Sequence, residues 1–346
     1  MKIAVITDQH FGVRKNSKLF HDFFLKFYDK VFFPYLEHHN ISTVIDMGDT
    51  FDNRTGINYS SLGWSKDNYF DRIRDLKINL YSLVGNHTAY YKNTNDLNAV
   101  DLLLREYDNV HVISEYKELE FDGLKIAMIP WINSENAEKT YKCITKSKCP
   151  VVMGHLELSG FYANKNHKME HGADRKAYEK FEKVYSGHYH HRSIIGNIEY
   201  VGNPYEIYWN DYGDERGFNI FDTDTLEMTH ILNPYKMFEV LEYDDTPWQT
   251  LNANEYENKI VKLVVRQKTK PKQFEKFVDK LIDAGVSDLQ IIENFSLTDT
   301  DDFEVEQSED TLTILGRYLD EVEVDIDKAA AKRIISHIYK EACEVV

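Results

Sequence analysis

The sequence predicts an α/β (α+β) fold: a two-sheet sandwich flanked by helices, then a small α+β capping domain and a C-terminal helical tail. Three observations predict it. Short apolar runs alternate with amphipathic segments in the first third, strand signals crowd the middle, and the pattern changes near Asn233-Pro234. A chain of 346 residues has room for two or three domains. We place the domains at 1–233 and 234–295, a linker at 296–310 and the tail at 311–346.

The first third of the chain has the pattern of βαβ units. Residues 3–7 form a short apolar run typical of a buried strand, and residues 18–39 carry apolar side chains at helical spacing. Further strands are predicted at 43–47 and 78–84, and further helices near 62–75 and 96–105. Strands separated by helices indicate a mostly parallel sheet. The apolar stripes of the helices near 62–75 and 96–105 are also candidate dimer surfaces, although such stripes are equally compatible with packing against a core.

The middle of the chain is richer in strands. Asp122-Gly123 is a strong hairpin-turn signal between strands at 118–121 and 124–129. A helix is predicted at 135–146, and further strands at 151–153, 183–186, 198–201, 217–222 and 225–231. These strands are enough for a second sheet.

Beyond residue 233 the pattern is that of a small α+β domain. Its predicted elements are strands at 236–243, 259–265 and 287–293 and a helix at 272–284. Residues 296–310 are acidic and poor in large apolar side chains, which predicts a linker. Two amphipathic helices follow, at about 310–322 and 327–344, and their apolar stripes need either each other or a partner as cover.

Charge and composition exclude several classes of protein. No apolar stretch approaches the ~18 residues of a membrane span, and the three cysteines form no CxxC pair and no disulfide framework. We therefore expect a cytoplasmic protein. The net charge of −17 is uneven, because twelve acids and one base in residues 299–327 account for −11 of it. The global charge is thus a poor guide to whether the surface attracts nucleic acid.

Polar clusters follow five of the predicted strands, each directly after the strand ends. Ligands of open α/β sheets bind at that edge, so we expect the clusters to meet. The candidate residues are Asp8 and His10, Asp49, Asn86 and His87, His155, and His188 and His190. Each of these short motifs alone is common in turns, but all five in this order, each after a strand, indicate a functional site.

The residue types indicate a metal site. Carboxylate, amide and imidazole ligands without thiolate suit manganese, iron or zinc. Asp49 has two carboxylate oxygens, so it can bridge two cations. Two ions ~3.5–4 Å apart can hold a phosphoryl group and activate water for in-line attack. We expect two divalent ions, with Mn²⁺ as the leading candidate and Mg²⁺, Fe²⁺ or Zn²⁺ as alternatives.

The ordered set resembles the calcineurin-like metallophosphoesterase superfamily, whose motifs are Asp-x-His, Gly-Asp-x-x-Asp, Gly-Asn-His, Gly-His and Gly-His-x-His. The resemblance covers residues 1 to about 230. Within the superfamily the chain is most similar to the Mre-eleven/SbcD DNA-repair nucleases, in particular to the recombination nucleases of T-even-like bacteriophages. The phrases that carry this match lie at 129–131, 154–162, 186–190 and 216–223.

The resemblance implies roles for these residues. One ion would be held by Asp8, His10, Asp49 and His190, and the other by Asp49, Asn86, His155 and His188. His87 would stabilise the scissile phosphate and protonate the leaving oxygen, a task that suits an imidazole. The family also implies a homodimer, located in the host cytoplasm if it is a phage protein. Its tail would dock on the coiled coil of an SMC-like ATPase (SbcC or Rad-fifty type).

Two positions depart from the usual pattern. Thr88 follows Gly-Asn-His where an acid is usual, so His87 has a neutral neighbour in place of a charged one. Asp52 stands where cellular relatives usually have histidine. It is either a residue that orients a ligand, which makes it a catalytic candidate, or a loop cap.

The small domain carries a run of bases. Lys262, Arg266, Lys268 and Lys270 alternate with apolar or neutral residues, which places them on one face of a strand. Such a face can contact a phosphate backbone without regard to base sequence. The alternative is an edge strand whose lysines prevent further pairing.

The favoured function is a two-metal DNA exonuclease or endonuclease, the nuclease subunit of an ATPase–nuclease complex that processes DNA ends in recombination, repair and replication. One alternative is a calcineurin-like phosphatase or phosphodiesterase that acts on a nucleotide or phosphoprotein. Another is a scaffold that binds metal and DNA ends without cutting, which Thr88 favours.

Overall fold

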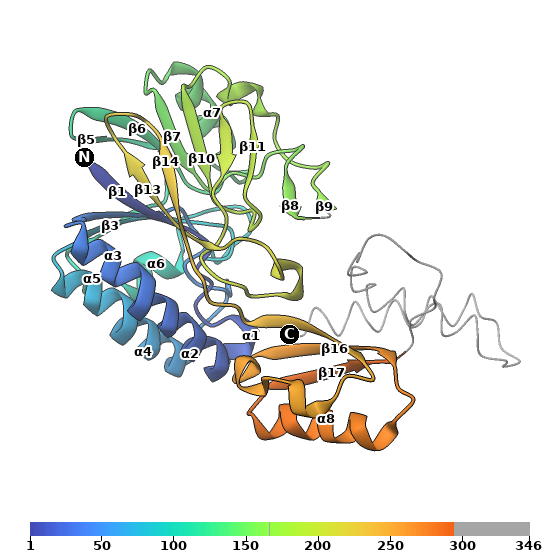
Figure 1. The fold of residues 1–346 in the computed structure, drawn as a ribbon. Helices are drawn as coiled ribbons and strands as arrows, with labels where there is room; N and C mark the ends of the chain where they lie inside the picture. Colours follow the sequence, from blue (N-terminus) through green and yellow to red (C-terminus); the bar gives the residue numbers. More distant parts are fainter. Residues whose placement is uncertain (166, 294–346) are drawn as a thin grey trace, which may run out of the picture. The chain divides into compact units, whose positions relative to one another are not determined.

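The computed structural model describes residues 1–165 and 167–293, which belong to one compact unit. Two six-stranded sheets form its larger part (Figure 1). The first sheet has the order β14 (Met228–Leu232), β13 (Gly217–Asp222), β1 (Lys2–Ile6), β2 (Thr43–Asp46), β3 (Asn79–Leu83) and β4 (Val110–Ile113). Strands β1 to β4 are parallel, as the βαβ pattern predicts, and β13 joins β1 antiparallel.

The second sheet contains the strands predicted for the middle of the chain. Its order is β11 (Ser193–Ile195), β12 (Ile198–Tyr200), β10 (Lys183–Ser186), β7 (Val151–Gly154), β6 (Leu124–Ile129) and β5 (Lys117–Phe121). Asp122 and Gly123 both have positive φ, 51° and 80°, which is the geometry of the predicted hairpin turn. β4 and β11 were not predicted, because both are short outer strands without a continuous buried face.

The side chains of β1 alternate between two cores. Ile3 and Val5 join the core between the sheets, whereas Ala4 and Ile6 join the core under the helices. A parallel strand that is covered on both faces reads as a continuous apolar run, which is what residues 3–6 show. A third core lies on the outer face of the second sheet, where α7 (Ala137–Lys146) contributes Ile144.

Helices cover the outer face of the first sheet (Figure 1). They are α2 (Lys18–Phe27), α3 (Phe33–His38), α4 (Tyr59–Ser65), α5 (Asp71–Asp75) and α6 (Ala99–Leu103). The predicted helix 18–39 is interrupted by a π-helical turn, η1 (Tyr28–Phe32), just before Pro34, whose missing N–H disturbs the regular hydrogen-bond ladder. A second π turn, η2 (Lys66–Phe70), joins α4 to α5.

The candidate dimer stripes face the protein's own core. Tyr69, Phe70 and Ile73 are fully buried among the helices that cover the first sheet, and Val100 is buried there too. These residues therefore cannot form a dimer surface in this fold. The helix predicted near 62–75 begins earlier, because Asn58 caps it by accepting a hydrogen bond from Ser60 N–H (2.9 Å).

The segment predicted as the capping domain, called the cap below, forms a parallel three-stranded sheet with one helix. The order is β15 (Phe238–Asp244), β16 (Ile260–Gln267) and β17 (Asp288–Ile292), and α8 (Pro271–Asp283) links the last two. Phe274, Phe277 and Leu281 of α8 are buried against Leu263 and Val265 of β16. Since β16 is the central strand, Lys262 and Arg266 do not protect an exposed edge, and that alternative is wrong for them. Lys268 and Lys270 lie beyond the end of β16, so the prediction that all four bases share one face of a strand is wrong for these two.

A short segment between β12 and β13 joins the cap to the larger part. The buried Glu206 carboxylate accepts hydrogen bonds from Met237 N–H (2.7 Å) and Phe238 N–H (3.0 Å), where β15 begins. The Trp209 ring lies 4.7 Å from the Phe238 ring. The remaining short elements are α1 (Val13–Asn16), β8 (Tyr162–Asn164), β9 (His167–Lys168), η3 (Arg175–Tyr178), η4 (Trp209–Asp211), η5 (Trp248–Thr250) and η6 (Ala253–Tyr256).

The predicted acidic linker and helical tail, residues 296–346, lie outside the described residues. Among the residues that the structure describes, no helix has the length and apolar character needed to cross a membrane.

Candidate metal centre

The predicted ligands come from loops at the carboxyl ends of strands in both sheets. β1, β2 and β3 of the first sheet lead to Asp8, Asp49 and Asn86. β7 and β10 of the second sheet lead to His155 and His188. The sequence pattern predicted convergence at the edge of one sheet. The structure instead places the site where the carboxyl ends of two sheets meet.

The backbone of these loops adopts an unusual conformation. Asp8, His10, Asp49 and His188 all have positive φ, between 49° and 85°. Non-glycine residues rarely adopt this left-handed region, and they cluster at functional sites where the surroundings impose it. Because four of the seven predicted ligands share this feature, the loops are built to aim side chains rather than to minimise backbone energy.

Glycines before the ligands let the loops approach one another. A Cβ atom on Gly85 would collide with the Asp49 carboxylate, and one on Gly187 would collide with Thr7. A Cβ on Gly48, which also has a φ of 111°, would collide with the His155 ring. The Gly in Gly-Asp, Gly-Asn-His and Gly-His-x-His is therefore required by space at this site.

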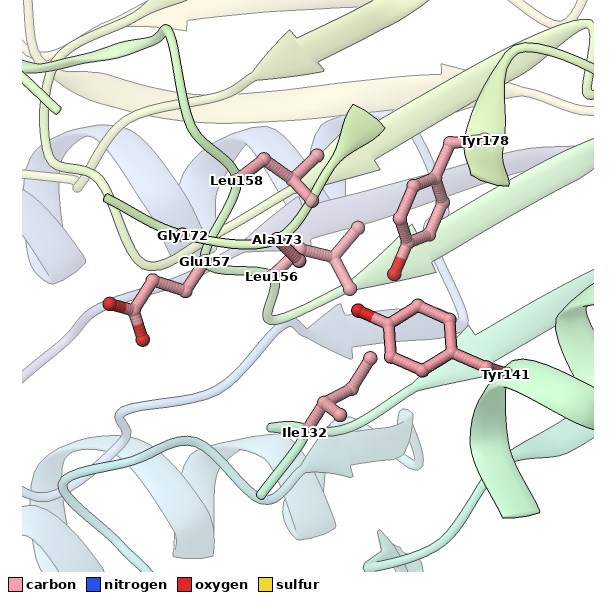
Figure 2. Close-up of a pocket in the computed structure, with 8 residues that line it drawn as sticks. All are labelled: Ile132, Tyr141, Leu156, Glu157, Leu158, Gly172, Ala173 and Tyr178. Atoms are coloured by element: carbon pink, nitrogen blue, oxygen red, sulfur yellow. The ribbon is translucent and has the colours of Figure 1, made fainter. Parts of the chain in front are cut away.

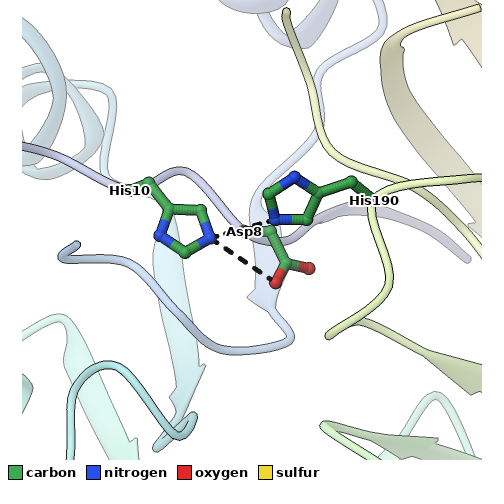
Figure 3. Close-up of side chains that lie close together, drawn as sticks. All are labelled: Asp8, His10 and His190. Carbon is green, nitrogen blue, oxygen red and sulfur yellow. Dashed lines mark hydrogen bonds and ion pairs between the residues drawn. The ribbon is translucent and has the colours of Figure 1, made fainter. Parts of the chain in front are cut away.

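One group of candidate ligands consists of Asp8, His10 and His190 (Figure 3). The two imidazoles bring their Nε2 atoms to 3.2 Å, and His10 Nε2 lies 3.9 Å from Asp8 Oδ1. Asp8 Oδ2 accepts hydrogen bonds from Thr7 Oγ1 (2.6 Å) and His188 N–H (3.0 Å). Asp8 Oδ1 is buried and has no hydrogen-bond partner among the described residues. An anionic oxygen turned toward two imidazole nitrogens is a donor set that fits a divalent cation.

The second group consists of Asp49, Asn86, His155 and His188. His155 donates through Nδ1 to the Met47 carbonyl (2.8 Å), which leaves its Nε2 3.2 Å from Asp49 Oδ2. The Asn86 Oδ1 atom lies 3.0 Å from His155 Nε2 and 2.8 Å from His188 Nδ1. A backbone carbonyl that fixes the tautomer of an imidazole is typical of metal ligands. The structure thus brings together Asp8, His10 and His190 in one group and Asp49, His155 and His188, with Asn86, in the other, and the bridging role of Asp49 stays a prediction.

Burial and mutual attraction set the charges of these groups. Burial raises the pKa of Asp8. For Asp49 burial acts in the same direction, but the attraction of His155 outweighs it and holds the pKa well below its usual range. Burial followed by repulsion from His155 lowers the pKa of His188 to about 3, and burial lowers that of His190 well below 6.5. Neutral imidazoles beside a carboxylate are the state that binds a metal ion.

His155 carries the opposite shift. Burial would lower its pKa, but the neighbouring Asp49 carboxylate raises it to about 9. Since a histidine must be neutral to bind a metal, cation binding at this group displaces a proton from His155.

His87 and Asp52 are held together. The His87 Nδ1–H donates to the Asp52 backbone carbonyl (2.6 Å), and the Asp52 carboxylate lies 3.2 Å from His10 Nδ1. The His87 and His10 rings are 4.9 Å apart. Asp52 therefore orients two rings at once, which favours the orienting role over a simple loop cap.

Thr88 has a different partner from the one its position suggests. Its hydroxyl accepts a hydrogen bond from Gly85 N–H (2.9 Å) and donates to Gly85 O (3.1 Å), and the side chain is fully buried. Thr88 closes the turn that carries Asn86 and His87. The Asp52 carbonyl is the group that orients the His87 ring, so the missing acid is replaced by a backbone acceptor.

Several supporting residues were not predicted. Asp46, at the end of β2, is buried and accepts hydrogen bonds from Gln9 Nε2 (2.9 Å) and Thr50 Oγ1 (2.7 Å), and burial raises its pKa to about 7. The buried Arg216 donates to the His190 carbonyl and to Asp214 (3.0 Å). The position of Asp46 at a strand end was a usable signal, whereas the contacts of Arg216 depend on the fold.

Three of the four predicted DNA contacts have side-chain partners within the cap or beside it. Arg266 pairs with Glu242 (2.8 Å) and Lys268 with Glu293 (2.8 Å), while Lys262 Nζ lies 4.1 Å from the centre of the Trp209 ring. Lys270 precedes α8 and is exposed. Their contact with DNA stays a prediction.

A cavity of about 190 Å³ is lined in part by Leu156, which follows the candidate ligand His155 in the sequence. Figure 2 shows the hydroxyl groups of Tyr141 and Tyr178 turned toward each other at one side of it, and Glu157 directed away from them. Its other lining residues are Ile132, Leu156, Leu158, Gly172 and Ala173. No candidate metal ligand lines this cavity, so it is separate from the metal centre.

Comparison with known proteins identifies the family. Residues 1–192, which contain every candidate metal ligand, match the calcineurin-like phosphoesterase family. The chain belongs to this family. It is accordingly a metal-dependent phosphoesterase that uses divalent ions, and the resemblance inferred from the motifs is confirmed.

Individual relatives are similar over different lengths. The chain is 29% identical to exonuclease subunit 1 of Enterobacteria phage T4, over 99% of this calcineurin-like phosphoesterase and 100% of the phage protein. The solved structure of an archaeal phosphodiesterase is 14% identical, with a TM-score of 0.35, and covers 67% of this chain and 100% of its own. A purple acid phosphatase from yellow lupin seeds is 11% identical, with a TM-score of 0.37, and covers 56% and 38%.

Proposed function

We propose that this phosphoesterase is a DNA nuclease, the nuclease subunit of a complex with an SMC-like ATPase. The observation that carries the proposal is the similarity to the phage exonuclease subunit, which extends over the whole chain, cap and tail included. A phosphatase that shared only the metal centre would match over the first part alone. The complex is proposed to act on DNA ends in recombination, repair and replication.

The charge of the site suits a phosphodiester. The proposed ligands are two carboxylates, Asp8 and Asp49, together with four neutral imidazoles and one amide. Two divalent ions would exceed the two carboxylate charges, so the loaded site attracts an anion. When bound, such ions polarise the phosphoryl group and supply a nucleophile from water at neutral pH.

His87 is the proposed proton donor. Its Nδ1–H is committed to the Asp52 carbonyl, so Nε2 is the ring nitrogen that can exchange a proton with a leaving oxygen. The Asp52 carboxylate, 3.2 Å from His10 Nδ1, keeps the neighbouring imidazole oriented toward Asp8. Asp52 is thus proposed as a positioning residue.

A single set of assays tests this function against both alternatives. The purified chain is incubated with Mn²⁺ and, separately, linear duplex DNA, circular single-stranded DNA and p-nitrophenyl phosphate, with His87→Gln as the active-site control and the exposed Arg105→Gln as the matched surface control. We expect DNA hydrolysis, little monoester hydrolysis, and loss of DNA hydrolysis in His87→Gln alone. Monoester hydrolysis without DNA cleavage would favour the phosphatase. DNA and Mn²⁺ binding without cleavage would favour the scaffold.

The partner and the homodimer need their own test. The sequence places Ile334 and Ile338 on the apolar stripe of the last predicted helix, and Lys340 lies off that stripe. We expect the full chain to co-purify with a coiled-coil ATPase, and Ile334→Asp with Ile338→Asp to lose it, whereas Lys340→Glu keeps it. Light scattering of the same samples measures whether the chain is a dimer. An ATPase that is retained by the double variant would place the docking site elsewhere.

A further inference from the structure

Two arginines lie on the neighbouring segments that also carry Asp8, His10, Asp49 and Asp52. The loops after β1 and β2 run side by side, because Phe11 N–H donates to Thr50 O (2.9 Å) and Asp52 N–H donates to Phe11 O (3.1 Å). Phe11 and Phe51 pair across them as a parallel bridge. Each loop carries an arginine three residues beyond this pair, Arg14 in one and Arg54 in the other.

Both arginines are held in the same way. Arg14 Nε donates to the Ile207 carbonyl (2.9 Å), and its guanidinium lies 4.8 Å from the centre of the Tyr208 ring. Arg54 Nη1 donates to the Ala89 carbonyl (3.3 Å), and its guanidinium lies 5.0 Å from the centre of the Trp131 ring. A guanidinium has five N–H donors, so one carbonyl and one aromatic face leave most of them available.

These contacts place each arginine next to a residue of the metal centre. The Tyr208 ring is nearly parallel to the ring of the metal ligand His190, 6.5 Å away. Ala89, which holds Arg54, comes two residues after His87, and Arg54 itself comes two residues after Asp52. Arg14 therefore lies on the His190 side of the centre and Arg54 on the His87 side.

Neither arginine has a carboxylate partner within 4.0 Å in the described ranges, 1–165 and 167–293. Of the seven other arginines in these ranges, all but Arg175 have one: Arg72, Arg74, Arg105, Arg192, Arg216 and Arg266. A cation that lacks a carboxylate beside a site for anions keeps its charge for a ligand. A guanidinium fork matches the oxygens of a phosphate and binds them through two parallel hydrogen bonds.

The backbone at Arg14 has an unusual conformation, which agrees with a role for this arginine in binding a ligand. Arg14, Lys15 and Asn16 follow one another with φ of 54°, 57° and 62°, all in the left-handed region. Non-glycine residues visit this region singly as a rule, and a run of three persists only where the surroundings impose it. The turn is compatible with a function that requires Arg14 to point at Tyr208 rather than follow the ordinary path into α2.

We propose that Arg14 and Arg54 bind the phosphates on either side of the scissile phosphate in a DNA strand. The inference rests on the proposed nuclease function and names what the site selects: a diester inside a polyanionic chain. A phosphomonoester or an isolated diester has no neighbouring phosphates and gains nothing from these two arginines.

The test compares two substrates, only one of which has neighbouring phosphates, and follows how each variant changes their ratio. Bis(p-nitrophenyl) phosphate has one phosphate, whereas the tetranucleotide TpTpTpT has a central phosphate with one on each side. The quantity measured is kcat/KM for the tetranucleotide divided by kcat/KM for the model diester, with Mn²⁺ content determined on every sample. The variants are Arg14→Gln, Arg54→Gln and both together. Arg105→Gln, which removes an exposed, ion-paired arginine just beyond α6, is the matched control.

We expect each glutamine variant to lower this ratio by about 10-fold or more, since a hydrogen bond to a charged group is worth at least that factor. Arg14→Lys and Arg54→Lys should restore part of it, because lysine keeps the charge and loses the fork. Arg105→Gln should leave the ratio unchanged. An unchanged ratio in the double variant, or an equal loss on both substrates, would overturn the inference while the nuclease function stands. Absence of DNA hydrolysis by the unaltered protein would instead overturn the proposed function.

Discussion

In the capping sheet, cations face carboxylates on neighbouring segments: Arg266 pairs with Glu242 on β15, and Lys268 pairs with Glu293 beyond β17. Beside the metal centre, Arg14 and Arg54 are held by a carbonyl and an aromatic ring instead. In the sequence the cap has the denser run of bases. In the folded chain, two of the four cap bases, Arg266 and Lys268, have a carboxylate partner, whereas Arg14 and Arg54 beside the metal centre have none within 4.0 Å among the described residues.

This difference shows how a basic run in a sequence misleads. An exposed ion pair adds about 0–1 kcal/mol to stability, but it also cancels the field that a polyanion would feel. The glutamates that pair with Arg266 and Lys268 come from β15 and from beyond β17, so residues 259–272 alone do not reveal them. The location of usable positive charge is a property of the fold.

The largest expected effect comes from removing the negative charge of Asp49, the ligand that is predicted to be shared by the two metal ions. Asp49→Asn should lose both Mn²⁺ sites and all measurable hydrolysis, because Asp49 is the only predicted ligand common to both. Calorimetric Mn²⁺ titration and a DNA cleavage assay measure these outcomes, with the exposed Asp75→Asn as the control. Retention of one strong Mn²⁺ site would mean that Asp49 serves a single ion.

His87→Gln should separate metal binding from turnover at the same centre. We expect Mn²⁺ binding to persist and kcat to fall by ~10²–10⁴, the range for a general acid. The measurement is single-turnover cleavage alongside the same titration. Loss of Mn²⁺ binding would show that His87 is a ligand and that the assigned roles are wrong.

Salt dependence compares the two sets of cations directly. Removing both Arg14 and Arg54 should reduce the slope of log Kd against log salt concentration by ~0.9 per lost phosphate contact on duplex DNA. Replacing Lys262, Arg266, Lys268 and Lys270 with glutamine should also weaken binding and flatten the slope, but by less per residue, because two of these bases already face glutamates. A larger loss per residue in the cap would reverse the comparison.

The smallest effect concerns the buried network below the metal centre. In metal-free protein the pKa of Asp46 is raised by burial to about 7, above its usual 3.8. Its contribution to stability is therefore complete below pH 3.8 and declines as the pH rises through 7. The difference in unfolding free energy between the unaltered protein and Asp46→Asn should fall over this interval in urea titrations with EDTA. A pH-independent difference would show that Asp46 stays ionised in the fold.

The sequence predicted the parts of the site that depend on local pattern. The position of each candidate ligand after a strand could be predicted, because apolar runs and polar loop residues can be recognised in the sequence. The strands β10 and β13 have the predicted bounds. The π-helical turn before Pro34 could not be predicted from the sequence pattern, since it depends on how the helix adjusts to the missing backbone N–H of proline. Nor were Glu206 and Arg216, whose partners lie about 30 residues away or on another loop.

β1 is synthesised before the other strands of its sheet, yet it lies inside that sheet, between β2 and β13. Its antiparallel partners are residues 219–222, so one side of the strand stays unpaired until most of the chain exists. At about 5–20 residues per second, about 10–40 s separate the synthesis of Asp8 from that of His190. During that interval the ribosome carries a chain that cannot assemble both ligand groups. Cleavage activity is thereby withheld from every nascent or prematurely released fragment that ends before His190.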